Sequence, residues 1–358
     1  MRWEGITEDC VFAFSPEIEP LFGVLSLLSG EAVHPVCTDL YGAEQIALWK
    51  RRYRFLFETF GAVKRLAPDL FFDLLLDTLS ENFTAETLRA HILALPEDER
   101  VFRMADWGYF GGATREDVLR ALTDDAALDA LYARLDEKCP SFLGFSSFVR
   151  QSKRYIEEFF ALAAELDTPA LHEALQAHEH EIDAFRTQVV DGLKSAGALE
   201  CSQKLMGKTF RNRGPYEQFF FLPSLLFPFK ALRLFYDNGT PHNRQILFYS
   251  IRRPETSRED TIAALKALSD ETRYQILLLL AKRGSVNGQE IVRALKLAPS
   301  TVSHHMTELK ERGLITEEAV KTAKYYGISK NVLRELLKTV SNDLDLDVSG
   351  TPVENDLP

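Results

Sequence analysis

Short hydroxyl side chains and imidazoles are concentrated between residues 299 and 312, and these are the groups of the sequence best suited to recognising another molecule. If this stretch forms a helix, Val302, Met306 and Leu309 share one face at the spacing of a buried stripe. The opposite face carries Ser300, Thr301, Ser303 and His304. Hydroxyl groups and ring nitrogens, free of long charged side chains, suit contacts with base edges in a groove of duplex DNA. We therefore expect these four residues to contact bases.

Basic side chains near this stretch are candidates for contacts with DNA phosphates, namely Arg273, Lys310, Lys321 and Lys324. Residues 261–340 contain 13 Lys or Arg and 8 Asp or Glu, although the whole chain has a net charge of −11. A basic segment on an acidic body is typical of phosphate contact confined to one region. Any single lysine in the segment is equally well explained as a solvated charge.

The patterns that indicate catalysis or a metal site are incomplete. His178 and His180 point about 200° apart on a helix and cannot share an ion on one face. His172–Gln176 resembles H-E-x-x-H, but glutamine replaces the second histidine. Gly144–Phe148 lacks the second glycine of a nucleophile elbow, and the sequence has no P-loop or G-x-G-x-x-G. We expect no enzyme activity, no cofactor and no metal.

A basic patch precedes a run of phenylalanines and could form a pocket for an effector. The residues concerned are Lys208, Arg211, Arg213, Phe219 and Phe221. In one interpretation the basic groups bind an acidic part of a ligand and the phenylalanines line an apolar cavity. In the other, the phenylalanines are core packing beside a solvated basic patch. Packing is the commoner origin of such a pattern.

Apolar residues at intervals of three or four predict helices through residue 203 or so, including 45–66, 115–135, 145–166 and 169–196. Two strands, Ala231–Tyr236 and Gln245–Ile251, flank the turn sequence Asp237-Asn238-Gly239, which predicts a β element within 216–251. The polar stretch Arg252–Ser257 is the best domain boundary. The fold class is therefore mainly α, with a large N-terminal domain over 1–252.

The segment 258–340 has the order of elements found in a winged helix-turn-helix. Helices are predicted over 257–268, 272–281, 289–295 and 299–312, a two-stranded wing over 314–328, and a last helix over 329–340. Gly313 suits the end of the fourth helix. The acidic tail 341–358 is predicted to be disordered.

Three motifs in this segment resemble the signature of the ArsR (arsenic-repressor) family of bacterial transcription regulators. They are Leu268–Arg273, Thr301–Met306 and Tyr325-Tyr326, and the resemblance covers about residues 260–340. It implies a homodimer on double-stranded DNA, with recognition helices in successive major grooves and an inverted repeat of half-sites about 10–10.5 bp apart. Ala298 departs from the usual serine, which puts the cap of the recognition helix in doubt.

The resemblance also raises metal sensing. The positions of the family's Cys-x-Cys ligands correspond to Asn287 and Gln289, and Asn331–Val340 has no histidine for the other usual site. Neither set of side chains can bind a metal as thiolate or imidazole ligands do. We therefore expect a non-metal small-molecule effector.

Scattered cysteines, a polar start and the lack of a long apolar run predict a cytoplasmic protein that does not enter a membrane. The sequence predicts a dimeric, sequence-specific transcription regulator, more typical of a repressor than of an activator. Its N-terminal domain would sense a ligand or extend the dimer interface. Two alternatives remain: an enzyme in residues 1–250 with a DNA-binding appendage, and a protein-interaction module whose winged helix packs on a partner.

Overall fold

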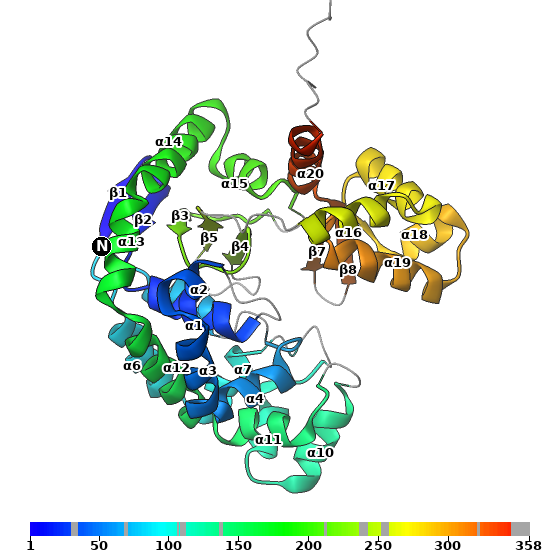
Figure 1. The fold of residues 1–358 in the computed structure, drawn as a ribbon. Coiled ribbons are helices and arrows are strands. Elements are labelled where there is room, and N and C mark those ends of the chain that lie inside the picture. The colour runs from blue at the N-terminus through cyan, green and yellow to red at the C-terminus, as the bar shows by residue number, and fades with distance from the viewer. Residues whose placement is uncertain are drawn as a thin grey trace, which may run out of the picture. The chain divides into compact units, whose positions relative to one another are not determined.

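The computed structural model describes residues 1–29, 35–67, 71–105, 107, 112–135, 139–210, 213–235, 243–251, 258–320 and 323–344. The chain divides into two compact units (Figure 1). The N-terminal unit comprises Met1–Ser202 with Asn212–Pro254, and the C-terminal unit comprises Gln203–Arg211 with Glu255–Pro358. Each unit has its own hydrophobic core. No helix in the described ranges combines the length and the hydropathy needed to cross a membrane.

The N-terminal unit contains most of the helices. They are α1 (Glu19–Ser29), α2 (Pro35–Tyr41), α3 (Ala43–Arg52), α4 (Arg54–Val63), the 3-10 helix Phe72–Leu74, α5 (Leu75–Thr78), α6 (Ala85–Ala94), α7 (Glu97–Arg103), α9 (Arg115–Ala121), α10 (Asp125–Ala133), α11 (Phe142–Arg150), α12 (Ser152–Leu166), α13 (Pro169–Ala177), α14 (Glu179–Ser195) and α15 (Ala198–Met206), whose last turn falls in the C-terminal unit.

Several helices predicted as single segments are pairs in the structure. Tyr53, Gln151 and His178 divide the predicted segments 45–66, 145–166 and 169–196. At each break a single residue leaves the helical backbone conformation, and apolar residues recur at helical spacing on both sides. The periodicity therefore identified the helical regions but not their ends.

The N-terminal unit also contains a five-stranded sheet in the order β1-β2-β3-β5-β4. The strands are β1 (Arg2–Gly5), β2 (Cys10–Phe14), β3 (Gln218–Ser224), β4 (Ala231–Phe235) and β5 (Arg244–Ser250). The prediction that residues up to about 203 are helical is therefore wrong for the first 14 residues. A five-residue apolar run does not by itself distinguish strand from helix. The partner of β2 is remote, since Val11 lies in parallel register with Phe220.

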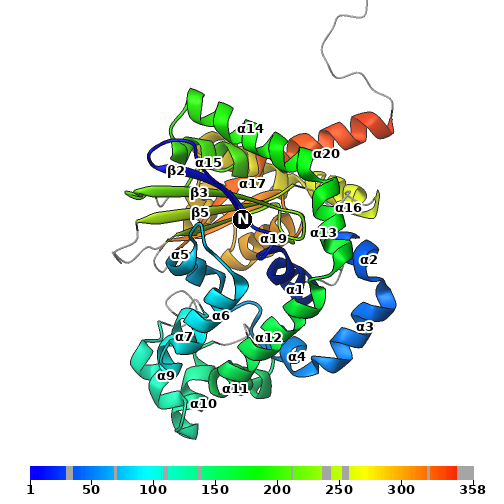
Figure 2. The same ribbon diagram turned by 90° about the vertical axis from the view of Figure 1, so that its left-hand side faces the viewer.

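The predicted strands 231–236 and 245–251 correspond to β4 and β5, which pair antiparallel with Leu232 opposite Phe248. The turn sequence between them lies outside the described residues. In Figure 2, α14 lies on one side of the sheet and α1 and α5 lie on the other. Phe185 of α14 stacks on Tyr249 at a centroid distance of 4.7 Å.

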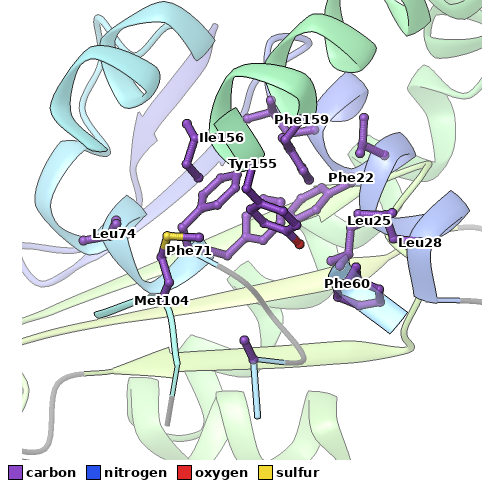
Figure 3. Packing of buried hydrophobic residues seen from close by; sticks show 14 of the residues in the cluster. Phe22, Leu25, Leu28, Phe60, Phe71, Leu74, Met104, Tyr155, Ile156 and Phe159 are labelled. Atoms are coloured by element: carbon purple, nitrogen blue, oxygen red, sulfur yellow. The ribbon is translucent and has the colours of Figure 1, made fainter. Parts of the chain in front are cut away.

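The main core joins α1, α12 and the sheet. Figure 3 shows Tyr155 and Phe159 of α12 directed toward Phe22 and Leu25 of α1. The Phe22 ring also packs edge-on against Phe248 of β5, with centroids 4.8 Å apart. The Tyr155 side chain is fully buried, and its hydroxyl has no hydrogen-bond partner among the described residues. Burial therefore raises the pKa of Tyr155 well above its ordinary value.

A buried carboxylate connects α1 to the end of β3. Glu19, the first residue of α1, accepts hydrogen bonds from the backbone N–H groups of Leu225 and Leu226 at 3.0 and 2.9 Å and from the Ser224 hydroxyl at 3.0 Å. Burial raises the pKa of Glu19 to about 7, against the lowering effect of these donors. A carboxylate shielded from water is thus held at the junction of helix and sheet.

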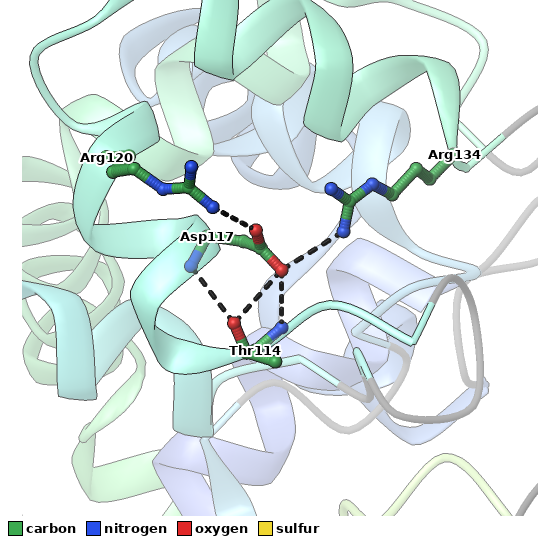
Figure 4. A network of polar contacts seen from close by, with 4 residues as sticks. All are labelled: Thr114, Asp117, Arg120 and Arg134. Carbon is green, nitrogen blue, oxygen red and sulfur yellow. Dashed lines mark hydrogen bonds and ion pairs between the residues drawn. The ribbon is translucent and has the colours of Figure 1, made fainter.

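A network of polar contacts holds α9 to α10 (Figure 4). Thr114 and Asp117 form a reciprocal cap at the start of α9. The Asp117 carboxylate also pairs with Arg120 at 2.7 Å and with Arg134 at 3.0 Å. The backbone N–H of Thr114, the Arg134 guanidinium and the Thr114 hydroxyl keep the pKa of Asp117 far below its usual range. Asp124 caps α10, so the predicted segment 115–135 is also two helices.

The C-terminal unit has the element order of a winged helix-turn-helix. It contains α16 (Arg258–Leu268), α17 (Glu271–Arg283), β6 (Val286–Asn287), α18 (Gly288–Leu295), α19 (Pro299–Glu311), β7 (Ile315–Val320), β8 (Ala323–Ile328) and α20 (Lys330–Asp343). The wing, β7 and β8, was predicted as two strands, and the structure adds the short strand β6 in the order β6-β8-β7. α20 includes the first residues of the predicted tail, and residues 345–358 lie outside the described part of the chain.

Candidate DNA-binding surface

The apolar stripe of α19 fixes the orientation of this helix. Val302, Met306 and Leu309 are buried in the core of the C-terminal unit, with exposed fractions of 3%, 4% and 0%. At the other end, Gly313 has a φ of 65°, which glycine adopts without strain. The backbone N–H of Leu314 then donates to the Leu309 carbonyl at 2.9 Å, which closes the helix. The orientation of α19 and its C-terminal end are thus determined by residues close together in sequence.

The start of α19 lacks a side-chain cap. Ala298 is the N-cap residue and offers no hydrogen bond to the first turn, as the departure from the family pattern predicts. Pro299 at the first helical position removes one of the N–H groups that would otherwise need a partner. The remaining N–H groups of the first turn therefore stay available to an external acceptor.

The polar face of α19 points away from the core. Ser300, Ser303 and His304 are exposed, and Thr301 is half-buried. Positions 300, 303, 304 and 307 share one face of the helix, and the Thr307 hydroxyl donates to the Ser303 carbonyl at 3.0 Å. The structure thus presents three of the four predicted base-contacting side chains together on an open surface, with Thr301 at its edge.

His305 lies between this face and the core. Its side chain is 14% exposed, and its Nδ1 atom is 3.7 Å from the Asp270 carboxylate. Asp270 in turn caps α17 by accepting from the backbone N–H of Arg273 at 2.8 Å. This N–H group and the charges of Arg273 and His305 lower the pKa of Asp270. His305 therefore packs at the edge of the core and does not belong to the exposed face.

The predicted phosphate contact Arg273 has a structural role in the free chain. Its side chain is 17% exposed, and its guanidinium donates to the carbonyls of Ala267 and Lys266 at 2.9 and 3.3 Å. It thereby satisfies carbonyls at the end of α16. Lys321, another predicted phosphate contact, lies outside the described residues.

Lys310 of α19 and Lys324 of β8 converge on one carboxylate that the sequence analysis did not single out. Glu317 Oε1 on β7 lies 3.2 Å from Lys310 Nζ and 3.0 Å from Lys324 Nζ. Burial and Glu317 together raise the pKa of Tyr326, which lies opposite Glu317 in the wing. The sequence signal that could have pointed to Glu317 was the pair of consecutive acids at 317 and 318 in an otherwise basic segment.

The residues of the predicted effector pocket belong to different parts of the chain. Phe219 and Phe221 are buried in β3, with exposed fractions of 6% and 0%. Arg213 pairs with Glu200 at 3.0 Å, and Lys208 Nζ lies 5.9 Å from the centroid of the Phe210 ring. Arg211 lies outside the described residues, and Lys208 belongs to the C-terminal unit. The buried phenylalanines fit the packing interpretation.

The histidines considered for metal binding each have another partner. His172 Nε2 lies 2.8 Å from Asp167, His178 Nδ1 lies 2.8 Å from the Ala174 carbonyl, and His180 pairs with Glu181 at 2.9 Å. Asn287, at a family metal position, instead caps α18 by accepting from the backbone N–H of Glu290 at 2.9 Å. Across the described residues, no group of three or more His, Cys, Asp or Glu could hold a metal ion.

Comparison with known proteins finds relatives of the C-terminal unit. The family model described as "Bacterial regulatory protein, arsR family" matches residues 270–317. An uncharacterised HTH-type transcriptional regulator of Methanocaldococcus jannaschii is 35% identical over 82 residues, which are 23% of this chain and 92% of that protein. The transcriptional repressor SdpR of Bacillus subtilis is 31% identical over 77 residues, which are 22% of this chain and 84% of that protein.

A solved structure with similarity to this unit is the winged helix-turn-helix DNA-binding domain of a possible ArsR-family transcriptional regulator from Mycobacterium bovis. It is 31% identical, and the match covers 24% of this chain and 82% of that one, with a TM-score of 0.21.

Proposed function

The chain belongs to the arsR family of bacterial regulatory proteins, whose members are DNA-binding transcription regulators, and we propose that it is a repressor that binds an inverted-repeat operator as a homodimer. The observation that carries this proposal is the exposed hydroxyl-and-imidazole face of α19, held on a buried apolar stripe. Ser300, Thr301, Ser303 and His304 read base edges in the major groove. The unpartnered N–H groups at the start of α19 favour a phosphate nearby.

Lys310 and Lys324 make the phosphate contacts, together with Lys321 between the wing strands. Support comes from the two lysines converging from the recognition helix and the wing on one side of the unit. Glu317 holds them there without DNA, and phosphates replace it in the complex. Arg273 is assigned to the junction of α16 and α17, because its guanidinium is engaged by the α16 carbonyls.

The first and last helices of the C-terminal unit form the dimer interface. α16 and α20 pack on each other and expose large apolar side chains, with exposed fractions of 43% for Ile262, 38% for Leu265 and 63% for Leu337. Leu344, directly after α20, is 62% exposed. Apolar surface of this kind favours association with a second copy. Two-fold symmetry of that pair matches an inverted repeat.

The N-terminal domain, residues 1–252, senses a non-metal effector, and the regulator acts in the cytoplasm, where the DNA is. A separate core and a mixed sheet give this domain a stability of its own, which a sensor needs.

Genome-wide mapping of DNA fragments bound by the full chain tests the proposal. The expected consensus is an inverted repeat with half-sites about 10–10.5 bp apart. A folded chain that enriches no motif would overturn it.

A further inference from the structure

The N-terminal unit has a cavity between α1, α6, α12 and the start of α13. Its volume is about 490 Å³, and its walls come from residues between Pro16 and His172. Small-molecule sites typically have volumes of about 300–1,000 Å³. The cavity is therefore large enough for a ligand of modest size, and it is distinct from the region around Lys208 and Phe219 considered above.

The floor of the cavity is apolar. Leu21 of α1 and Phe160 of α12 are buried, with exposed fractions of 0% and 8%. Ala161 and Ala164 continue the lining along α12 and are exposed. Because alanine is short, the space above these positions is not filled by the helix's own side chains. A ligand with an apolar body would cover this surface and remove it from water.

The rim of the cavity is acidic. Four carboxylates line it, those of Glu17, Glu86, Glu157 and Asp167, against the one guanidinium of Arg89 and the imidazole of His172.

Both basic groups of the rim already have acidic partners. Arg89 makes two hydrogen bonds to Glu86, at 2.7 and 2.8 Å, and His172 lies 2.8 Å from Asp167. Among the described residues, Glu157 makes one long ion pair, with Lys153 at 3.9 Å, and is attracted to Arg89. A positively charged group entering the cavity would therefore be attracted, and an anion would be repelled.

We propose that this cavity binds an organic cation with an apolar body, such as an alkyl- or arylammonium compound, and that this ligand is the effector. The apolar body lies on Leu21, Phe160 and the two alanines, and the ammonium group lies at the rim near Glu157. Asp167, about 15 Å farther along α12, attracts the cation only at longer range. The effector role rests on the proposed DNA-binding function, whereas the binding of the cation does not.

Isothermal titration of the full chain with three probes tests the binding. Octyltrimethylammonium has both an apolar body and a cationic group. Octanoate replaces the cation by an anion, and tetramethylammonium lacks the apolar body. The first probe is expected to bind at least about tenfold more tightly than the other two, which corresponds to about 1.4 kcal/mol. No heat from octyltrimethylammonium at two temperatures about 15 °C apart, or equal affinity for octanoate, would overturn the proposal without any variant.

Variants then locate the site. Glu157→Gln with Asp167→Asn should weaken binding of octyltrimethylammonium by about tenfold, because it removes the close charge at Glu157 and one of the three other negative charges of the rim. Ala164→Phe should abolish binding by filling the cavity. Asp129→Asn, which neutralises an exposed carboxylate on α10 outside the cavity, is the matched control and should leave the affinity unchanged. Wild-type affinity in both the double variant and Ala164→Phe would place the ligand elsewhere and overturn the assignment.

The regulatory role is tested separately with operator DNA. Octyltrimethylammonium should change the affinity of the wild-type chain for its operator and should leave the Ala164→Phe variant unaffected. A chain carrying Ser303→Ala and His304→Ala should keep its affinity for the cation although its sequence preference is relaxed. If the cation binds but operator affinity stays constant, the effector role fails. If the chain binds no operator at all, the proposed function fails while the binding result stands.

Discussion

Glu317 on the wing lies 3.2 Å from Lys310 on the recognition helix, so one carboxylate links the two parts expected to touch DNA. The same oxygen lies 3.0 Å from Lys324. In the free chain, part of the positive charge that phosphates would meet is therefore neutralised. In the proposed complex, the lysines exchange this carboxylate for phosphate.

Replacing Glu317 by glutamine should strengthen binding to DNA of any sequence. The change removes a negative charge from the surface and releases two lysines, so the slope of log affinity against log salt should steepen by about 1. Fluorescence anisotropy with a random duplex at several KCl concentrations measures this. Glu318→Gln alters the net charge equally on the next residue of β7, whose side chain points to the other face of the strand. Equal effects of the two variants would contradict a local role for Glu317.

Base contacts and phosphate contacts should respond differently to substitution. Ser303→Ala with His304→Ala should relax sequence preference at the positions these residues contact, where lost contacts are worth about 1–3 kcal/mol. Lys324→Ala should instead weaken binding to all sequences and reduce the salt slope by about 1. Selection from a randomised duplex pool, repeated for each variant, separates the two effects. Unchanged preference and slope in both variants would show that another face binds DNA.

The dimer interface should be sensitive to charge on α20 but not on α17. Leu337→Glu would bury a charge in the interface and should weaken the dimer by roughly 3 kcal/mol, or about a hundredfold. Light scattering after size-exclusion chromatography measures the oligomeric state. Leu278→Glu is the matched control, because Leu278 on α17 is also apolar and 53% exposed. Loss of the dimer in the control but not in Leu337→Glu would move the interface to α17.

Asp270 should stabilise the junction on which the recognition helix rests. Asp270→Ala removes the cap of α17 and the contact with His305, at a cost of about 1 kcal/mol. Amide hydrogen exchange in α17 should become about fivefold faster in the full chain. Asp270→Asn keeps a capping oxygen and should exchange much as wild type does. Equal acceleration in the two variants would point to the charge of Asp270 rather than its cap.

Stability of the N-terminal unit should fall as the pH rises toward neutrality because of Glu19. Its pKa is about 7 in the folded chain and 4.5 ordinarily, so between these values the folded chain retains a proton that the unfolded chain has lost. The free energy of unfolding should decline over this window by up to about 3 kcal/mol and then level off. Urea denaturation at pH 5 and pH 7.5 measures the decline.

Glu19→Gln should remove this part of the pH dependence. Glu44→Gln, which changes an exposed acid in the first turn of α3, should retain it. If the free energy of unfolding of Glu19→Gln declined between pH 5 and pH 7.5 as much as that of the wild type, other groups would cause the effect.

Sequence patterns predicted the C-terminal unit well because its determinants are local. The stripe of Val302, Met306 and Leu309 and the helix end at Gly313 lie within one segment, and the structure confirms both. Glu317 was overlooked because its importance depends on Lys310 and Lys324 reaching it from other elements. The net charge of residues 261–340 does not reveal that the Glu317 carboxylate lies between two of the lysines.

The N-terminal unit was harder to predict because its sheet and its cavity are assembled from distant segments. Val11 becomes part of a buried strand only through its register with Phe220. The cavity likewise joins Leu21, Arg89 and Phe160, which no spacing rule connects. The phenylalanines at 219 and 221 suggested a pocket from composition, yet in β3 they are buried packing.

The pairing of β2 with β3 also determines how this chain can be divided or synthesised. During translation, β2 is synthesised long before β3, so the two strands can pair only after Phe220 has emerged from the ribosome. Until then β2 has an open edge that other strands could occupy. A fragment stopped at Ser202 would lack three of the five strands and should aggregate, whereas one ending after Ser250 keeps the sheet whole.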